Sequence, residues 1–370
     1  ELHFKKLMDF DTIGGKSNKN GARFDLDAMY VNWLGLSLKC YLPKSENSLS
    51  YVWESLKGKI SYCNIKRLMF SSGWRYYAEI VVSGAAPTRV SIGTSTMGID
   101  PGVSTIAGVS EDACVLEELA PNAIQYEKKI QKISQSMDRS RRISNPNKYN
   151  EDGTINRSNR DPWKYSKNYV KMCRLLKSLY RKKHAYIIDS HRKLCNKLIT
   201  IARYFPVEKM HFQALQKRSK ETKRQEKKTE VKQKNGTVKV IQKYKRKKRF
   251  GRSINRRAPA RFLLELKRKA EAVGGVYAEV DTKEFKASQY NHVTDAYEKI
   301  PLSQREKEIG KRKVQRDLYS AFLIRNADLD FKHPDREKCE YEFEHFAKMQ
   351  DQLILKMKES GLSMRQCFGF

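Results

Sequence analysis

The stretch Met97-Gly-Ile-Asp-Pro-Gly-Val-Ser-Thr-Ile-Ala-Gly marks the point where the chain changes character. An apolar strand ends in Asp100, a Pro-Gly turn follows, and Thr105-Ile-Ala-Gly-Val and Ala113-Cys-Val-Leu continue as two further short strands. Residues 1–96 instead alternate apolar and polar positions, with a turn at Ser71-Ser72-Gly73 that is typical of a hairpin. Because closure removes exposed strand edges, we expect this first part to form a small antiparallel β-barrel.

The rest of the chain mixes helices and strands. Helical periodicity and many basic residues predict a basic helical insertion over 122–203. Further elements follow in chain order: an extended segment at 204–215, a helix at 258–273, a strand at 276–280, a helix that starts at Gln315, and a last helix at 335–357. We therefore predict an α+β (mixed) protein of three parts, at 1–96, 97–330 and 331–370.

The charge balance points to a polyanionic partner. The 370 residues hold 75 Lys and Arg against 42 Asp and Glu, a formal net charge of +33, which disfavours a small neutral substrate as the main ligand. The apolar fraction of 39% excludes a disordered polycation. No apolar run approaches the roughly 20 residues of a membrane span, so we expect a cytoplasmic protein without a membrane partner. Because the chain begins with Glu1 rather than Met, we interpret it as a fragment or as a protein whose start is missing.

Residues 217–257 carry the densest charge, with 19 Lys and Arg and 3 acids. Such a run is either a solvated loop or a nucleic-acid contact, and counterion release at phosphates favours the contact. The predicted contact residues are Lys217, Arg218, Lys245, Arg246, Lys247, Lys248, Arg249, Arg252, Arg256 and Arg257. Four aromatic residues lie among basic ones and either stack on unpaired bases or pack in the protein: Trp163, Tyr165, Tyr244 and Phe250.

Three acids stand out in so basic a chain. Asp100 ends an apolar strand, Glu208 lies in a second one, and Asp317 lies in the first turn of a helix with an apolar face. Each has a simpler explanation, as a turn residue, a solvated strand position or a charge favoured by the helix dipole. If they converge, three carboxylates repel one another unless divalent cations offset their charge. That arrangement predicts a two-metal site for Mg²⁺, or Mn²⁺, that cleaves phosphodiesters.

Three motifs in this order resemble those of a known nuclease family. Residues 97–108 look like the first motif of the RuvC-type nucleases in TnpB proteins and type V CRISPR effectors. Val207-Glu-Lys-Met-His-Phe is similar to the second motif, and Gln315-Arg-Asp-Leu-Tyr-Ser-Ala-Phe-Leu to the third. Gly14-Gly-Lys-Ser-Asn-Lys-Asn-Gly-Ala-Arg-Phe resembles the wedge domain that precedes the nuclease domain, and Arg249-Phe-Gly-Arg-Ser-Ile-Asn-Arg-Arg-Ala-Pro also resembles TnpB-type proteins.

The resemblance implies an RNase H-like mixed sheet with flanking helices, joined to a β-barrel. It also implies a guide RNA, a double-stranded DNA target, two Mg²⁺ ions held by the three acids, and a guide from a transposon end or a CRISPR array. We expect a monomer. Two features depart from the family. The interval between Glu208 and Asp317 holds no cysteine, so we expect no zinc ribbon, and no helical recognition insertion is visible within the first part.

Two other functions stay open. One is an RNA-guided DNA-binding repressor that has lost cleavage, against which the three intact acids argue. The other is a guide-independent basic nucleic-acid-binding protein, such as a transposition accessory factor, for which target choice would not depend on any bound RNA.

Overall fold

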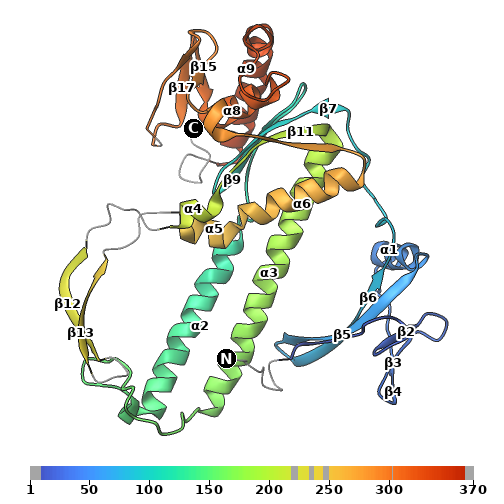
Figure 1. Cartoon of the computed structure of the whole chain (residues 1–370), viewed down its shortest axis with the longest axis vertical. Helices are drawn as coiled ribbons and strands as arrows, with labels where there is room; N and C mark the ends of the chain where they lie inside the picture. The colour runs from blue at the N-terminus through green and yellow to red at the C-terminus, as the bar shows by residue number, and fades with distance from the viewer. Residues whose placement is uncertain (1–9, 218–223, 233–236, 245–249, 302, 363–370) are drawn as a thin grey trace. The chain divides into compact units, whose positions relative to one another are not determined.

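The computed structural model describes residues 10–217, 224–232, 237–244, 250–301 and 303–362 (Figure 1). The chain folds into two compact units, the first made of residues 1–89 and 124–186 and the second of residues 90–123 and 187–370. The predicted boundaries after residues 96 and 330 stay a prediction.

The first unit begins with two three-stranded sheets. One has the order β1 (Thr12–Gly14), β5 (Ile60–Phe70), β6 (Gly73–Val82), and the other β2 (Arg23–Asp25), β3 (Tyr30–Trp33), β4 (Leu36–Lys39). The hairpin around Ser71-Ser72-Gly73 is confirmed, since β5 and β6 pair as antiparallel neighbours. Within residues 10–89 these sheets do not close into the expected barrel, because β2–β4 are only three or four residues long and every residue of β4 is exposed. A helix that the sequence reading missed, α1 (Glu46–Leu56), contributes Leu56 to the small core.

Two long helices lie where the sequence predicts a helical insertion. They are α2 (Ala123–Ser144) and α3 (Lys167–Ile201), whose residues 124–144 and 167–186 belong to the first unit. There Tyr126 packs against Tyr186 with ring centroids 5.7 Å apart. The polar link between the helices contains a single 3₁₀ turn, η2 (Pro146–Lys148).

A sheet covered on both faces forms the centre of the second unit. Its strands run in the order β10 (Cys114–Glu118), β9 (Thr105–Val109), β8 (Gly98–Pro101), β11 (Ala202–Glu208), β14 (Val276–Val280), and β7 (Ser95–Thr96) pairs with β11. The first three strands are antiparallel, whereas β8, β11 and β14 are parallel. Successive residues of β9 point to opposite faces of the sheet. Ile106 belongs to the hydrophobic core that the sheet forms with α3 and α6 (Pro259–Ala272). Ala107 belongs to the core that the sheet forms with α8 (Arg316–Arg325) and α9 (Arg336–Glu359).

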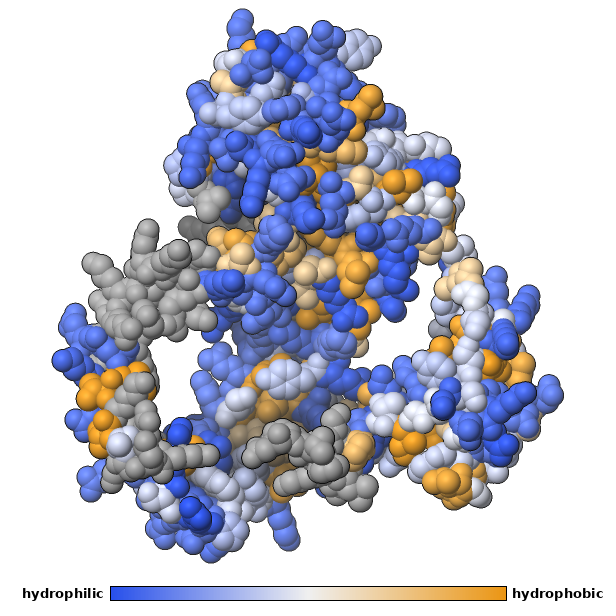
Figure 2. Space-filling view, in the orientation of Figure 1, coloured by the Kyte–Doolittle hydropathy of each residue, from blue (hydrophilic) through white to orange (hydrophobic). Residues whose placement is uncertain are grey.

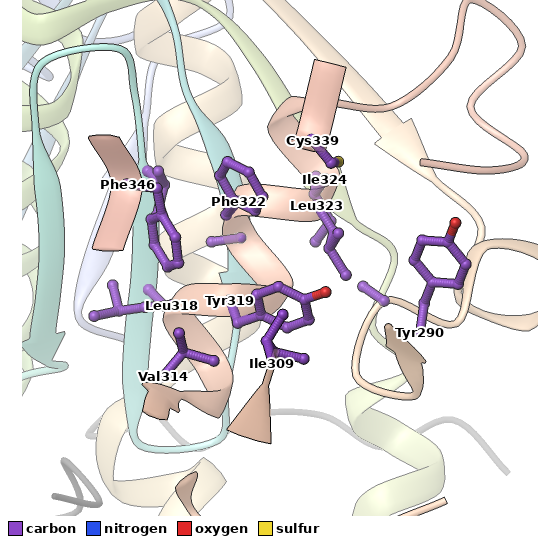
Figure 3. Packing of buried hydrophobic residues seen from close by; sticks show 14 of the residues in the cluster. Tyr290, Ile309, Val314, Leu318, Tyr319, Phe322, Leu323, Ile324, Cys339 and Phe346 are labelled. Carbon is purple, nitrogen blue, oxygen red and sulfur yellow. The ribbon is translucent and has the colours of Figure 1, made fainter. Parts of the chain in front are cut away.

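Between β14 and α8 lie a short helix, α7 (Thr282–Phe285), and two hairpins: β15 (Tyr290–Asn291) with β16 (Ala296–Tyr297), and β17 (Glu306–Ile309) with β18 (Arg312–Gln315). We call β15–β18 the hairpin module. Its Ile309 and Val314 lie beside Leu318 and Tyr319 of α8 (Figure 3). The buried Lys307 ammonium donates to the carbonyl of Tyr290 at 2.7 Å and so ties one hairpin to the other.

Two more elements complete the described residues: a basic ribbon, β12 (Arg224–Lys232) with β13 (Val238–Tyr244), and a pair of short helices, α4 (Phe212–Gln216) and α5 (Gly251–Arg257). Hydrophilic residues cover most of the C-terminal part of the chain on the face that Figure 2 shows. In the part of the chain that the structure describes, no helix is long and apolar enough to cross a membrane.

Candidate carboxylate site and basic surfaces

Strand pairing in the central sheet brings Asp100 and Glu208 together. The parallel strands β8 and β11 are in register at Ile99 and Val207, so the next residue of each strand is one of the two acids. Because parallel strands end at the same edge of a sheet, both carboxyl groups lie at that edge. Their side chains are hydrogen-bonded to each other.

Helix α8 brings the third acid to the same place. Asp317 is its second residue, and the side chain of Gln315 caps the helix by accepting from the backbone nitrogen of Leu318 at 2.6 Å. The helix packs directly on β8 at Gly98, where a Cβ atom would lie 2.2 Å from the carbonyl oxygen of Ala321. Only glycine fits this close approach.

The electrostatics show that all three acids interact. Burial raises the pKa of Asp100 well above its ordinary value, and the charges of Glu208 and Asp317 raise it further. Burial also raises the pKa of Glu208, an effect that the hydrogen bond with Asp100 opposes. Each of the three acids is nevertheless only partly buried. The structure therefore brings the three acids close enough to influence one another, and their role as a catalytic site stays a prediction.

Two arginines that the sequence reading did not single out approach Asp317. The Nη1 atom of Arg305 lies 3.6 Å from its Oδ2 atom, and the Nε atom of Arg316 lies 3.6 Å from its Oδ1 atom. Arg316 also lowers the pKa of both other acids. The position of Arg316 next to Asp317 was a signal available in the sequence, whereas Arg305 comes from just before β17 and only the fold reveals it.

The donor set fits a hard divalent cation in its chemistry. Carboxylate oxygens are the ligands that Mg²⁺ and Mn²⁺ prefer, and such a cation would relieve the repulsion among the three acids. As the side chains stand, no group of three His, Cys, Asp or Glu residues within the described ranges is arranged to hold a metal ion. Asp317, which faces Arg305 and Arg316, would have to turn from them to join the other two acids.

The predicted nucleic-acid contacts differ in their surroundings. Lys217 and Arg252 are exposed, and Arg256 is partly exposed. Arg218 and the run Lys245, Arg246, Lys247, Lys248 and Arg249 lie outside the described residues, as does the side chain of Tyr244. Phe250 is exposed.

The structure argues against the predicted contact of Arg257 with nucleic acid, because Arg257 is only 8% exposed and its guanidinium pairs with Glu118 of β10. Its carbonyl is also 2.9 Å from Nε2 of the buried His191. We therefore assign Arg257 a structural role, in which it fastens α5 to the central sheet.

Of the remaining aromatic candidates, Trp163 is a packing residue. Its ring meets Tyr149 edge-on, with centroids 6.1 Å apart, and Arg141 and Lys148 lie 5.4 and 5.2 Å from its centroid. Tyr165 is half exposed and stacks on Tyr169.

Comparison with known proteins finds a structural similarity. No family model and no curated protein matches the chain. Among solved structures, the chain is similar to one in the cryo-EM structure of a CRISPR-Cas12f ternary complex, at 15% sequence identity and a TM-score of 0.33. The alignment covers 79% of this chain and 49% of that one, so the chain spans about half the length of this relative.

Proposed function

We propose that the protein is an RNA-guided DNA endonuclease of the TnpB and type V kind, with an RNase H-like nuclease domain. The observation that carries the proposal is the convergence of Asp100, Glu208 and Asp317 from β8, β11 and α8 at one edge of the central sheet. The strand order, with three antiparallel strands followed by two parallel ones, supports the RNase H-like assignment. The guide RNA rests on the resemblance of the three motifs and on the net charge of +33.

The three acids would hold two Mg²⁺ ions. When bound, such ions supply Lewis acidity for hydrolysis of a phosphodiester. The residues of the chain prepare the site in three ways. Asp100 and Glu208 supply carboxylates from two neighbouring strands, Gly98 lets α8 bring Asp317 close, and Arg316 offsets part of the negative charge.

One observation favours a second candidate, a guided DNA-binding protein that does not cleave. The carboxylate of Asp317 is engaged by Arg305 and Arg316 rather than directed into a three-carboxylate site. If these two arginines held the carboxylate of Asp317 permanently, nucleic-acid binding would be intact but cleavage would be prevented.

The first test is to purify the protein from cells that carry its native locus and to sequence the RNA that accompanies it. A single structured RNA with a variable 3′ end supports guided targeting, whereas a smear of cellular RNA supports a generic basic binder. A plasmid that matches the variable end is then incubated with the complex and Mg²⁺.

Asp100→Ala should abolish cutting and leave RNA and DNA binding unchanged. Asp112→Ala, which removes an exposed acid in the turn between β9 and β10, is the matched control and should cut normally. Cutting by Asp100→Ala would contradict the site, and binding without cutting by the unaltered chain would favour the second candidate.

A further inference from the structure

A cationic hollow of about 640 Å³ lies in the first unit, beside the first two turns of α3. Lys167, Lys171 and Arg174 line it from the helix, Tyr165 from the residues just before the helix, and Ser71 from the turn between β5 and β6. We call it the α3 hollow. The tip of the β5–β6 hairpin reaches α3 in the same unit (Figure 1), where Arg181 donates to the carbonyl of Met69 at 3.1 Å. None of these residues belongs to the carboxylate site.

The three cations of the hollow form no ion pair with any residue that the structure describes. Lys167, Lys171 and Arg174 are spaced four and three residues apart, so they share one helix face. All three are exposed, and none pairs with a carboxylate in the ranges that the structure describes. Like charges at this spacing repel one another and destabilise the helix, so this face favours the binding of an anion.

The next cations along α3 behave differently. Lys177 lies 4.7 Å from the ring centroid of Trp74 and 3.4 Å from a carboxylate oxygen of Asp11. Arg181 lies 3.7 Å from the ring centroid of Phe70. These two residues fasten the hairpin tip to the helix, which fixes one wall of the hollow. Lys177 and Arg181 thus stabilise the fold, whereas the three cations of the hollow remain available for a ligand.

Tyr165 supplies an aromatic platform at the edge of the hollow. Its ring stacks on that of Tyr169, with centroids 4.6 Å apart and planes inclined by 18°. The backbone nitrogen of Tyr169 in turn donates a hydrogen bond to the hydroxyl of Ser166 at 3.0 Å, which fixes the position of Tyr169. Since one face of Tyr165 is supported and the side chain is 50% exposed, an unpaired base can stack on the other face.

We propose that the α3 hollow binds single-stranded nucleic acid, with a base stacked on Tyr165 and the flanking phosphates at Lys167, Lys171 and Arg174. The proposal rests on the proposed function only in sharing a nucleic-acid partner, because neither the acids nor a metal takes part. A duplex is excluded as the preferred ligand, since its bases already stack on one another and present no free face.

The test measures binding of the full chain to short labelled oligo(U), oligo(dT) and a duplex by fluorescence anisotropy in EDTA. Tyr165→Ala should weaken single-strand binding about tenfold, and Tyr165→Phe should keep it. Lys171→Ala with Arg174→Ala should lower the slope of log affinity against log salt by about 1.4. The control, Lys311→Ala with Lys313→Ala, removes two exposed lysines of the second unit and should leave this slope unchanged. Thermal melting checks that each variant is folded.

Each result decides between alternatives. Tighter binding of either single strand than of the duplex supports the proposal, and the preferred strand, RNA or DNA, identifies the source of the ligand. Equal binding of the duplex, or no loss in Tyr165→Ala, overturns it. A chain that binds single strands as described but never cuts DNA contradicts the proposed function alone. Normal cutting with no effect of Tyr165→Ala contradicts this inference alone.

Discussion

The phenol oxygen of Tyr319 lies 2.8 Å from Nδ1 of His292 and 3.2 Å from the backbone nitrogen of the same residue. The backbone N–H donates to the phenol, so the phenol donates its own proton to Nδ1, and we infer that the imidazole proton is on Nε2. Tyr319 follows Asp317 by two residues on α8, and His292 lies in the hairpin module. The pair therefore joins that module to the helix that carries the third acid.

Loss of this phenol should destabilise the protein. Tyr319→Phe leaves the buried N–H and Nδ1 of His292 without partners, which we expect to cost about 1–3 kcal/mol in the free energy of unfolding. Urea denaturation measures the change. The control is Tyr297→Phe, because the phenol of Tyr297 meets His333 at 3.1 Å on the surface and its loss should cost far less. Equal losses in both variants would contradict the role of the buried pair.

The stability of the protein should fall in mild acid. Burial lowers the pKa of His191 and of His292 to about 4. The unfolded chain, with a histidine pKa near 6.5, then binds more protons than the folded chain between these values. The contribution of each histidine to the free energy of unfolding is therefore complete above about pH 6.5. As the pH falls from there, this contribution decreases by up to about 1.4 kcal/mol per pH unit, and the decrease ends near pH 4.

Comparison with His292→Asn isolates this effect from the opposite contribution of Asp100 and Glu208, whose raised pKa values favour the folded state in acid. The asparagine oxygen can accept from Tyr319 and does not titrate. Unfolding in urea at pH 7 and pH 5 should show that the unaltered chain loses more stability than His292→Asn. An identical loss in both proteins would refute the assignment.

Arg305 should compete with metal ions for Asp317. The ion pair is partly exposed, and such pairs are worth about 0.2–1 kcal/mol. Arg305→Gln should therefore tighten Mn²⁺ binding by a factor of about 1.4 to 5, as measured by titration calorimetry. Arg312→Gln is the matched control, because Arg312 lies in β18, the strand that pairs with β17, and its guanidinium pairs with Glu344 instead. Weaker Mn²⁺ binding in Arg305→Gln would show that the arginine assists the site.

Gly98 should tolerate no side chain. A Cβ atom there would lie 2.2 Å from the carbonyl oxygen of Ala321 and 2.3 Å from the backbone nitrogen of Arg325, so β8 and α8 would have to separate. We expect Gly98→Ala to cost about 1–3 kcal/mol or more in unfolding free energy and to impair cutting. At Gly251 a Cβ atom meets nothing within 4 Å, so Gly251→Ala should be neutral in both assays.

The sequence predicted the parts of the fold that have strong local patterns. The strands around Asp100, the strand at 276–280 and the long helices all have the expected type, because their apolar periodicity is long or their turns contain Pro and Gly. The three acids could be named because each is an exception in its surroundings. Their meeting depends on the parallel register of β8 with β11 and on the close approach at Gly98, neither of which a single sequence reveals.

The features that sequence reading missed depend on contacts between distant residues. The hairpin module consists of strands of two to four residues, too short for a periodic signal, and is held by tertiary contacts such as that of Lys307 with Tyr290. Arg257 belongs to the densest run of charge in the chain, and only its contact with Glu118, 139 residues earlier in the sequence, shows that it supports the fold.

The contact between α4 and α5 has a consequence for how this protein can diversify. Because Arg257 fastens α5 to β10, the polypeptide leaves the central sheet after α4 and rejoins it at the place where it left. Lengthening the stretch between them then adds a chain-closure cost of roughly 0.6 kcal/mol for each doubling of its length. New sequence can thus be grafted between the two helices without moving the three acids.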